Sequence, residues 1–182
     1  MNVIETSIKD VLVVEPRVFK DDRGYFFESY NQSKVPDVLA QVNWVQDNES
    51  KSSRGVLRGL HYQCGDHAQA KLVRAIIGEI YDVAIDLRPN SSTYGQFHAE
   101  ILSSDNKKQM YVPRGFAHGF VVLSDVAIFS YKCDNFYNKE SEGGLLYNDT
   151  ALSIPWPIDH QEILVSDKDA VLPILGKHKP AL

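Results

Sequence analysis

The chain has 182 residues, 43% hydrophobic and 24% charged, which suits a single domain, spanning 1–182, with a hydrophobic core. Its net charge of −5 at pH 7, without a basic tract, argues against a nucleic-acid partner, because such binding needs clustered lysine and arginine. No apolar run is long enough to cross a bilayer, no signal-peptide pattern is present and the two cysteines form no C-x-x-C motif, so we expect a cytoplasmic protein without a membrane partner.

Taken in chain order, the predicted elements are mostly short β-strands. They cover residues 11–14, 24–30, 56–63, 71–77, 81–87, 97–102, 109–113, 119–123 and 127–132. The clearest are 81–87 and 127–132, where apolar and polar side chains alternate as in a strand with one apolar face. Turn-forming residues at 20–24, 89–92 and 104–106 separate the strands. Many short strands with regular turns predict a mainly β fold, a sandwich or a barrel.

Helix is scarce in this pattern. Asn31 is positioned to cap a short helix through 35–40, whose Pro36 is tolerated in a first turn. A second short helix is expected at 166–171, with Ser166 as its cap. We expect about 170–182 to be a C-terminal extension or a loose tail, because most of its last residues are polar.

Arg58 and His61 lie three residues apart in a strand-like run, with Gly59 between them. Strict alternation would send the two side chains to opposite faces of a sheet. Gly59 predicts a β-bulge, which would let both side chains reach one cavity. Taken alone, a histidine in such a strand is more often structural than catalytic.

The segment 113–118 has the spacing P-x-G-x-x-H, which resembles the second metal-binding motif of cupin barrels. An ordinary cupin metal site also needs an H-x-H pair in its first motif. The corresponding segment here, 61–63, reads His-Tyr-Gln and lacks the second histidine. We therefore expect no bound metal, and we expect His118 to bind substrate or to support His61.

Aromatic residues crowd the segment 129–137. Phe129 is best explained as ordinary core packing. Tyr131 and Tyr137 carry hydroxyl groups that need partners if they are buried. A tyrosine can also serve as a general acid, and an aromatic ring can stack on a nucleotide base. Both tyrosines are therefore candidate site residues.

Several segments, taken together and in this order, resemble dTDP-4-dehydrorhamnose 3,5-epimerases, the third enzyme of dTDP-L-rhamnose synthesis. The matching segments are FKDDRGYFFE at 19–28, QDN at 46–48, VLRGLHYQ at 56–63, GEIYDVAIDLR at 78–88, PRGFAHGF at 113–120 and IPWP at 154–157. The resemblance implies a cupin-type β-barrel or jelly roll that forms a homodimer. It also implies a dTDP-sugar substrate, catalysis without metal or other cofactor, and a product used as a precursor of cell-surface polysaccharide.

The resemblance implies roles for the residues at matching positions. His61 matches the base that abstracts a proton, and Asp169 matches the carboxylate that orients it. Lys71 matches the cation beside the keto oxygen, and Tyr131 matches the acid that returns a proton from the other face. The positions that match ligand contacts are Arg23, Glu28, Gln46, Asp47, Asn48, Arg58, His118, Tyr137, Glu142 and Lys168, with Tyr137 stacked on the thymine.

These residue types suit an epimerisation beside a ketone. A ketone at C4 acidifies the hydrogens at C3 and C5, because the carbanion is delocalised as an enolate. Inversion of either carbon removes a proton on one face and returns one on the other, which requires two opposed groups. Imidazole accepts protons near neutrality, whereas a phenol with its unperturbed pKa of about 10 stays protonated and can donate. Guanidinium forks such as those of Arg23 and Arg58 suit a pyrophosphate.

We therefore expect the chain to convert dTDP-4-dehydro-6-deoxy-D-glucose to dTDP-4-dehydro-L-rhamnose. One alternative is a related activity on the same scaffold, either a C3-only epimerase or a 3,4-ketoisomerase. Another alternative, motivated by His61 and His118, is a metal-dependent cupin oxygenase or a sugar-sensing barrel without catalysis.

Overall fold

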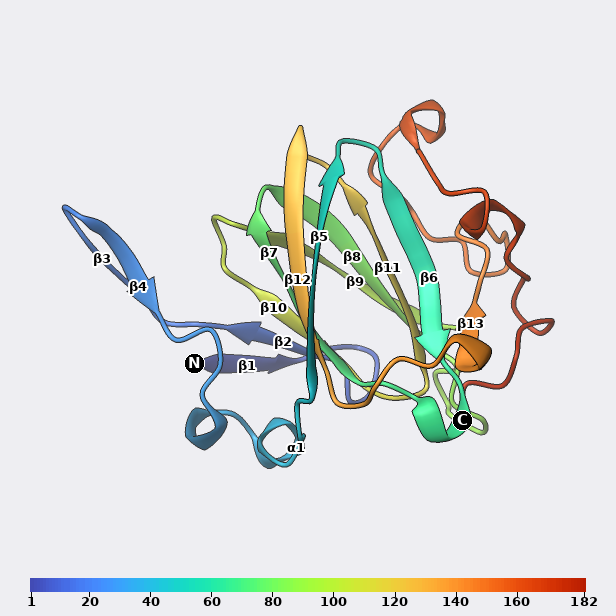
Figure 1. Ribbon diagram of the computed structural model, residues 1–182, viewed down its shortest axis with the longest axis horizontal. Coiled ribbons are helices and arrows are strands. Elements are labelled where there is room, and N and C mark those ends of the chain that lie inside the picture. Colours follow the sequence, from blue (N-terminus) through green and yellow to red (C-terminus); the bar gives the residue numbers. More distant parts are fainter.

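The computed structural model describes residues 1–182 and consists mainly of two antiparallel sheets (Figure 1). The six-stranded sheet has the order β1 (Asn2–Glu5), β2 (Leu12–Glu15), β10 (Gln109–Val112), β7 (Lys71–Ile77), β12 (Val126–Cys133) and β5 (Gln46–Ser53). The five-stranded sheet has the order β13 (Glu142–Gly144), β6 (Leu57–Gln63), β11 (Phe116–Val122), β8 (Glu79–Asp86) and β9 (Phe97–Ser103). The strands β3 (Val18–Asp21) and β4 (Gly24–Phe27) form a hairpin that projects from the body (Figure 1).

Helical structure is limited to single turns, as expected for a mainly β fold. They are α1 (Asp37–Ala40) and the 3₁₀ turns η1 (Gln32–Lys34), η2 (Gly65–His67), η3 (Lys139–Ser141), η4 (His160–Glu162) and η5 (Asp169–Val171). None of the helices is long and apolar enough to cross a membrane. The mainly β prediction is confirmed.

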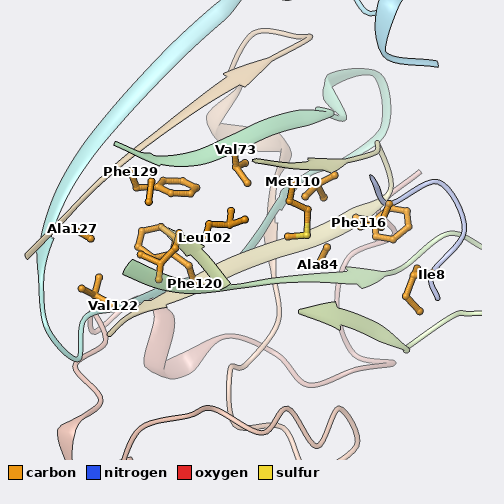
Figure 2. Packing of buried hydrophobic residues seen from close by; sticks show 14 residues of the cluster. Ile8, Val73, Ala84, Leu102, Met110, Phe116, Phe120, Val122, Ala127 and Phe129 are labelled. Carbon is orange, nitrogen blue, oxygen red and sulfur yellow. The ribbon is translucent and has the colours of Figure 1, made fainter. Parts of the chain in front are cut away.

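Side chains from both sheets meet between them in a hydrophobic core (Figure 2). Phe129 of β12 and Phe120 of β11 face each other there, with ring centroids 4.3 Å apart. The outer face of the five-stranded sheet is also covered, because Val83 of β8 packs in a second cluster with Trp156 from the C-terminal part of the chain. Both faces of this sheet are therefore buried.

This second cluster corrects the one-sided interpretation of 81–87. The alternation predicts one apolar face and one polar face. Instead, Val83 and Ile85 pack under the C-terminal segment, while Ala84 points into the space between the sheets. Asp82 and Asp86, on the supposedly polar face, have no exposed surface. A carboxylate therefore lies inside the molecule, beside the cavity described below.

The predicted bulge in β6 is present. The register between β6 and β11 shifts by one residue between Phe120 and His118. Gly59 lies in the resulting bulge, with a φ of +141° that side chains rarely adopt. Arg58 and His61 consequently line the same cavity.

Replacing Gly59 with alanine should destabilise the fold. The added Cβ would lie 2.6 Å from the Gly119 Cα and 3.1 Å from a backbone oxygen, neither of which is the end of a flexible side chain. Overpacking of this kind costs about 1–3 kcal/mol, beyond the backbone strain. Gly24→Ala is the matched control, because Gly24 has a φ of +135° and nothing within 4 Å. In urea denaturation, Gly59→Ala should lose more stability than Gly24→Ala; equal losses would contradict the steric argument.

Four strands were not predicted from the sequence: β1, β3, β5 and β13. The strand β5 is the most important of them, because it carries candidate ligand contacts. It reads QDNESKSS and has no apolar face. It pairs with β12 along its full length, from Val126 opposite Ser53 to Cys133 opposite Gln46. Tertiary pairing, rather than intrinsic propensity, makes this segment a strand.

The predicted cap residues make local hydrogen bonds, but neither of them caps the helix predicted for it, and the helices are shorter than expected. Both α1 and η5 begin without a side-chain cap. The Asn31 side chain accepts the Ser33 N–H and caps the single turn η1, and α1 begins separately after Pro36. The predicted helix at 166–171 reduces to η5, where the Ser166 hydroxyl accepts the Asp169 N–H at 3.1 Å. A proline disfavours helical geometry in the residue that precedes it. Val35, which precedes Pro36, is accordingly extended, and this explains the break ahead of α1.

The C-terminal tail is held against the body of the molecule and is not loose. The Tyr62 hydroxyl donates to the Lys179 carbonyl at 2.6 Å, and the Leu175 N–H donates to Asp149 at 2.7 Å. Ala181 is completely buried. The polar composition misled the prediction because backbone groups, rather than apolar side chains, make several of these contacts.

Candidate active site

A cavity of about 620 Å³ opens between the two sheets. Its walls come from β5, β6, β7, β11, β12 and the segment 164–169. The four predicted catalytic residues all line it: His61, Lys71, Tyr131 and Asp169. A second cavity of about 440 Å³ shares His61, Lys71, Tyr131 and Lys168 with the first, so the two are contiguous.

The segment that carries Asp169 is attached to the start of β6 by backbone hydrogen bonds. The Leu57 N–H donates to the Leu164 carbonyl at 2.8 Å, and the Leu164 N–H donates to the Gly55 carbonyl at 2.9 Å. A Cβ at Gly55 would overlap the Glu162 carbonyl, so only glycine permits this close approach. The attachment brings residues that are more than 100 positions apart to one wall of the cavity.

His61 and Asp169 form a close pair on this wall. The distance from His61 Nε2 to Asp169 Oδ1 is 2.7 Å, and the Gly59 N–H lies 3.4 Å from the other carboxylate oxygen. Burial acts to raise the pKa of Asp169, but the hydrogen bonds from His61, Gly59 and Ser166 outweigh it and hold the pKa below its ordinary value. Asp169 is therefore ionised at neutral pH and can accept the His61 Nε2–H.

Tyr131 and Lys71 lie on neighbouring strands, β12 and β7. The Tyr131 ring packs on Phe129 with centroids 5.4 Å apart, and the Lys71 ammonium lies 5.8 Å from the Tyr131 ring centre. Burial raises the pKa of Tyr131, with a smaller contribution from Cys133, so its phenol stays protonated. Burial also lowers the pKa of Lys71, although Cys133 and Asp82 oppose this effect.

A second histidine–carboxylate pair lies deeper in the cavity. His118 is directly opposite His61 in the strand register, and its Nε2 lies 2.9 and 3.1 Å from the two oxygens of Asp82. The exposed fractions are 6% for His118 and zero for Asp82. The His118 ring also stacks on Phe129, with an interplanar angle of 15°.

Five predicted ligand contacts are joined by hydrogen bonds at the mouth of the two cavities. Glu142 accepts the Tyr137 hydroxyl at 3.0 Å and the Lys168 ammonium at 2.6 Å. The Gln46 side chain accepts the Tyr137 N–H at 3.3 Å and donates to Asn48 at 3.0 Å. Polar groups from β5, from the segment 137–142 and from Lys168 are therefore linked beside the two cavities.

Three predicted ligand contacts lie elsewhere. Arg23 is on the projecting hairpin, where its side chain is 90% exposed and pairs with Asp21. Glu28, just beyond the hairpin, pairs with Lys34. Asp47 pairs with Lys132 and lines a third cavity of about 170 Å³, which shares only Tyr131 with the other two. Within one chain, the structure does not bring these three residues to the main cavity.

Sequence reasoning missed two polar residues that support the site, Asp82 and Ser52, and named Ser166 only as a helix cap. Asp82 holds His118, Ser166 accepts the Asp169 N–H, and the Ser52 hydroxyl accepts the Arg58 Nε–H at 3.0 Å. The pattern of apolar and polar residues did not place Asp82 or Ser52 on a buried face of a strand, although both are buried. The only available signal was that Asp82 belongs to a segment matching the family. No group of three or more His, Cys, Asp or Glu side chains is arranged to ligate a metal.

Comparison with known proteins decides the family. The family model described as dTDP-4-dehydrorhamnose 3,5-epimerase matches residues 5–177. The chain belongs to the dTDP-4-dehydrorhamnose 3,5-epimerase family. It is 54% identical to the dTDP-4-dehydrorhamnose 3,5-epimerase of Escherichia coli over 170 residues, which is 93% of this chain and 91% of that protein. The resemblance seen in the sequence is thereby confirmed.

Solved structures of this epimerase family have the same fold. The crystal structure from Elizabethkingia anophelis is 56% identical, with a TM-score of 0.91 and 96% of each chain covered. The structure from Legionella pneumophila, a complex with dTDP-4-keto-L-rhamnose, is 45% identical, with a TM-score of 0.90 and coverage of 95% of this chain and 92% of that one. The cupin-type prediction is confirmed, and so is the predicted activity: an isomerase of dTDP-L-rhamnose biosynthesis.

Proposed function

We propose that this epimerase inverts C3 and C5 of dTDP-4-dehydro-6-deoxy-D-glucose with His61 as the base and Tyr131 as the acid. The observation that carries the proposal is that both residues line one cavity, with Asp169 paired to His61 at 2.7 Å. The sugar would lie in this cavity, between the two proton-transfer groups. Each inversion then takes a proton from one face and returns one to the other.

The pair with Asp169 determines which nitrogen of His61 acts as the base. The ionised carboxylate accepts the Nε2–H, so the lone pair of a neutral imidazole lies on Nδ1. Nδ1 has no hydrogen-bond partner in the chain and is not buried, so it is free to reach the substrate. When Nδ1 takes a proton, Asp169 stabilises the imidazolium that forms.

Lys71 is proposed to stabilise the enolate oxygen that forms at C4. The developing negative charge lies on that oxygen, and a cation held in place beside it stabilises the charge more than water does. Apart from a long contact of 3.5 Å to the His61 carbonyl, the Lys71 ammonium has no hydrogen-bond acceptor. It is therefore available to the substrate.

Replacing Lys71 with methionine should lower kcat about 100-fold or more, the usual effect of removing one such electrostatic group. Stability should not fall, because methionine keeps much of the length and removes a buried charge. Burial lowers the pKa of Lys71. As the pH rises, kcat of the native enzyme should therefore begin to fall at a lower pH than the titration of an ordinary lysine would give. Lys71→Met should lack this alkaline decline. An unchanged alkaline limb in the variant would contradict the assignment.

The nucleotide is proposed to occupy the second cavity and its mouth. Tyr137 is 54% exposed there and offers its ring for stacking on thymine. Glu142 lines this cavity, and Gln46 bonds to the Tyr137 N–H at its mouth. Lys168 lines both cavities, whereas Arg58 and Asn48 line the first, so Arg58 and Lys168 would supply positive charge for the diphosphate where the two cavities meet. This division leaves the first cavity for the sugar.

We also propose that Arg23 and Glu28 act in a homodimer, each chain supplying its hairpin to the site of the other. The hairpin carries three exposed aromatic rings, Phe19, Tyr25 and Phe26, with exposed fractions of 50%, 57% and 67%. An isolated two-stranded hairpin is at best marginally stable, and exposed apolar side chains of this kind mark protein contacts. Burial against a second copy would satisfy both conditions.

Mixing two inactive variants tests this arrangement. A dimer of an Arg23→Glu chain and a His61→Ala chain has one site with both residues intact only if the hairpin crosses to the partner. Chains refolded together should then regain activity well above that of either variant alone. Activity that stays at the level of the separate variants would contradict the exchange.

The reaction itself is tested by proton exchange. The enzyme, incubated with dTDP-4-dehydro-6-deoxy-D-glucose in heavy water, should place deuterium at both C3 and C5. Deuterium at C3 alone would instead indicate a C3-only epimerase, and a displaced carbonyl would indicate a ketoisomerase. No exchange at either carbon would refute the proposed mechanism.

The proposal includes catalysis without metal or other cofactor, in the cytoplasm. The segment 61–63 lacks the second histidine of a cupin metal motif, and the Nε2 atoms of His61 and His118 each face a carboxylate. Both cysteines are free thiols, as suits a reducing compartment. In the exchange assay, a chelator should therefore leave the rate unchanged; loss of activity together with stoichiometric iron would favour the metal-dependent alternative.

A further inference from the structure

Asp82 is a buried carboxylate for which the proposed chemistry has so far given no role. It lies in the middle of β8 with no exposed surface, and both of its oxygens face His118 Nε2 at 2.9 and 3.1 Å. Burying a carboxylate is costly unless it is paired, and an apolar residue on this strand would avoid the cost. The partner of Asp82 lines the sugar cavity, which points to a role in the site.

Burial raises the pKa of Asp82, and basic groups on three other strands act against this effect. They are His118 on β11, Lys71 on β7 and His98 on β9. The His98 Nε2 is buried without a hydrogen bond and lies 3.8 Å from Glu100. Burial also lowers the pKa of Lys71. The charge of Lys71 lowers the pKa of Asp82, and the charge of Asp82 raises the pKa of Lys71, so each group favours the charged form of the other. Asp82 is thus the carboxylate that acts on both His118 and Lys71.

We propose that Asp82 is a positioning residue for the epimerisation: it holds His118 in one tautomer and supplies the counter-charge that keeps Lys71 protonated beside the enolate. This inference rests on the proposed function, since it assigns Lys71 to the enolate oxygen. Asp82 does not touch the substrate and acts only through these two side chains.

The tautomer matters because the two nitrogens of His118 face different surroundings. Nε2 donates to Asp82, while Nδ1 has no partner in the chain and is not among the buried polar atoms. Burial lowers the pKa of His118, so its imidazole is neutral and Nδ1 carries a lone pair. Nδ1 then accepts a hydrogen bond from a sugar hydroxyl. Without Asp82, the proton could occupy Nδ1 and the acceptor would be lost.

Asp86 provides a matched control on the same strand. It lies four residues further along β8, on the same face, and is also completely buried. Its partners are Arg88, Ser91 and Thr93, none of which lines the sugar cavity. The substitutions Asp82→Asn and Asp86→Asn therefore remove the same charge from equally buried positions, but only the first lies beside the site.

The two variants should differ in kinetics rather than in stability alone. Asp82→Asn should lower kcat about 100-fold with little change in KM, because it disturbs groups that act in the transition state. The decline of its kcat at alkaline pH should move to lower pH, because Lys71 loses the carboxylate that favours its charged form. Only the influence of Cys133, which also favours that form, then remains. Asp86→Asn should lose stability in urea but keep the native pH profile. A native kcat and pH profile in Asp82→Asn would overturn the inference, whereas no exchange activity in the native enzyme would refute the proposed function instead.

A measurement on the native enzyme covers the case in which Asp82→Asn does not fold. Nitrogen-15 NMR of the histidine rings distinguishes a protonated from an unprotonated ring nitrogen. Near neutral pH, His118 should be protonated on Nε2 and unprotonated on Nδ1, without any need for substrate. A proton on Nδ1 with Nε2 bare would overturn the proposed role of Asp82.

Discussion

Deuterium from heavy water should appear at neither C3 nor C5 once His61 is replaced by asparagine. Asparagine cannot accept a proton at neutral pH, and no other free base in the cavity has the position of His61 Nδ1. A general base contributes about 10²- to 10⁴-fold to the rate, so turnover should fall by at least that range. The measurement is deuterium incorporation by NMR, together with kcat from product formation.

His160→Asn is the control for this substitution, because His160 lies exposed in η4 and outside both cavities. It should exchange both positions at the native rate. Exchange at the native rate in His61→Asn would show that another group is the base.

Asp169→Asn extends the same test to the orientation of His61. The amide presents a donor as well as an acceptor, so the imidazole proton can move to Nδ1 and the base is lost. Because the pKa of Asp169 is held below its ordinary value, the stability that the pair contributes is present at neutral pH. That contribution is lost only as the pH falls through the lowered pKa of Asp169. A fall in kcat at a less acidic pH therefore reflects the protonation of groups other than Asp169.

Tyr131→Phe should separate proton removal from inversion. Phenylalanine keeps the ring that packs on Phe129 and removes only the hydroxyl. His61 can still abstract a proton and return a deuteron to the same face, so substrate should gain deuterium with its configuration retained. Epimerised product should fall about 10²- to 10⁴-fold, because the acid on the other face is missing.

Tyr137→Phe is the matched control for Tyr131. It removes a hydroxyl that bonds only to Glu142, at the mouth of the cavity, and is expected to alter KM rather than inversion. If Tyr131→Phe inverts C3 and C5 at the native rate, Tyr131 is not the acid. If it loses exchange as well as inversion, the two steps are not separable in the way proposed.

Much of the fold and of the site could be predicted because the signals are local. Alternation identified most of the strands, and Gly59 between Arg58 and His61 indicated a bulge that the structure contains. The motifs around His61 and Tyr131 supported their candidate roles. Local patterns failed where pairing supplies the structure, as in β5, whose polar sequence is a strand only because β12 lies beside it.

The sequence by itself determined the family, the mainly β class and the chemical groups available for catalysis, since these depend on residue identity and short-range spacing. Only the tertiary structure decided which of these groups meet. His61 and Asp169 are 108 residues apart and pair because backbone hydrogen bonds attach the segment near Leu164 to the start of β6. Likewise, alternation separates the two faces of β8 but does not reveal what covers them. Because the C-terminal segment covers the outer face, the face carrying Asp82 is the one that lies inside, beside His118.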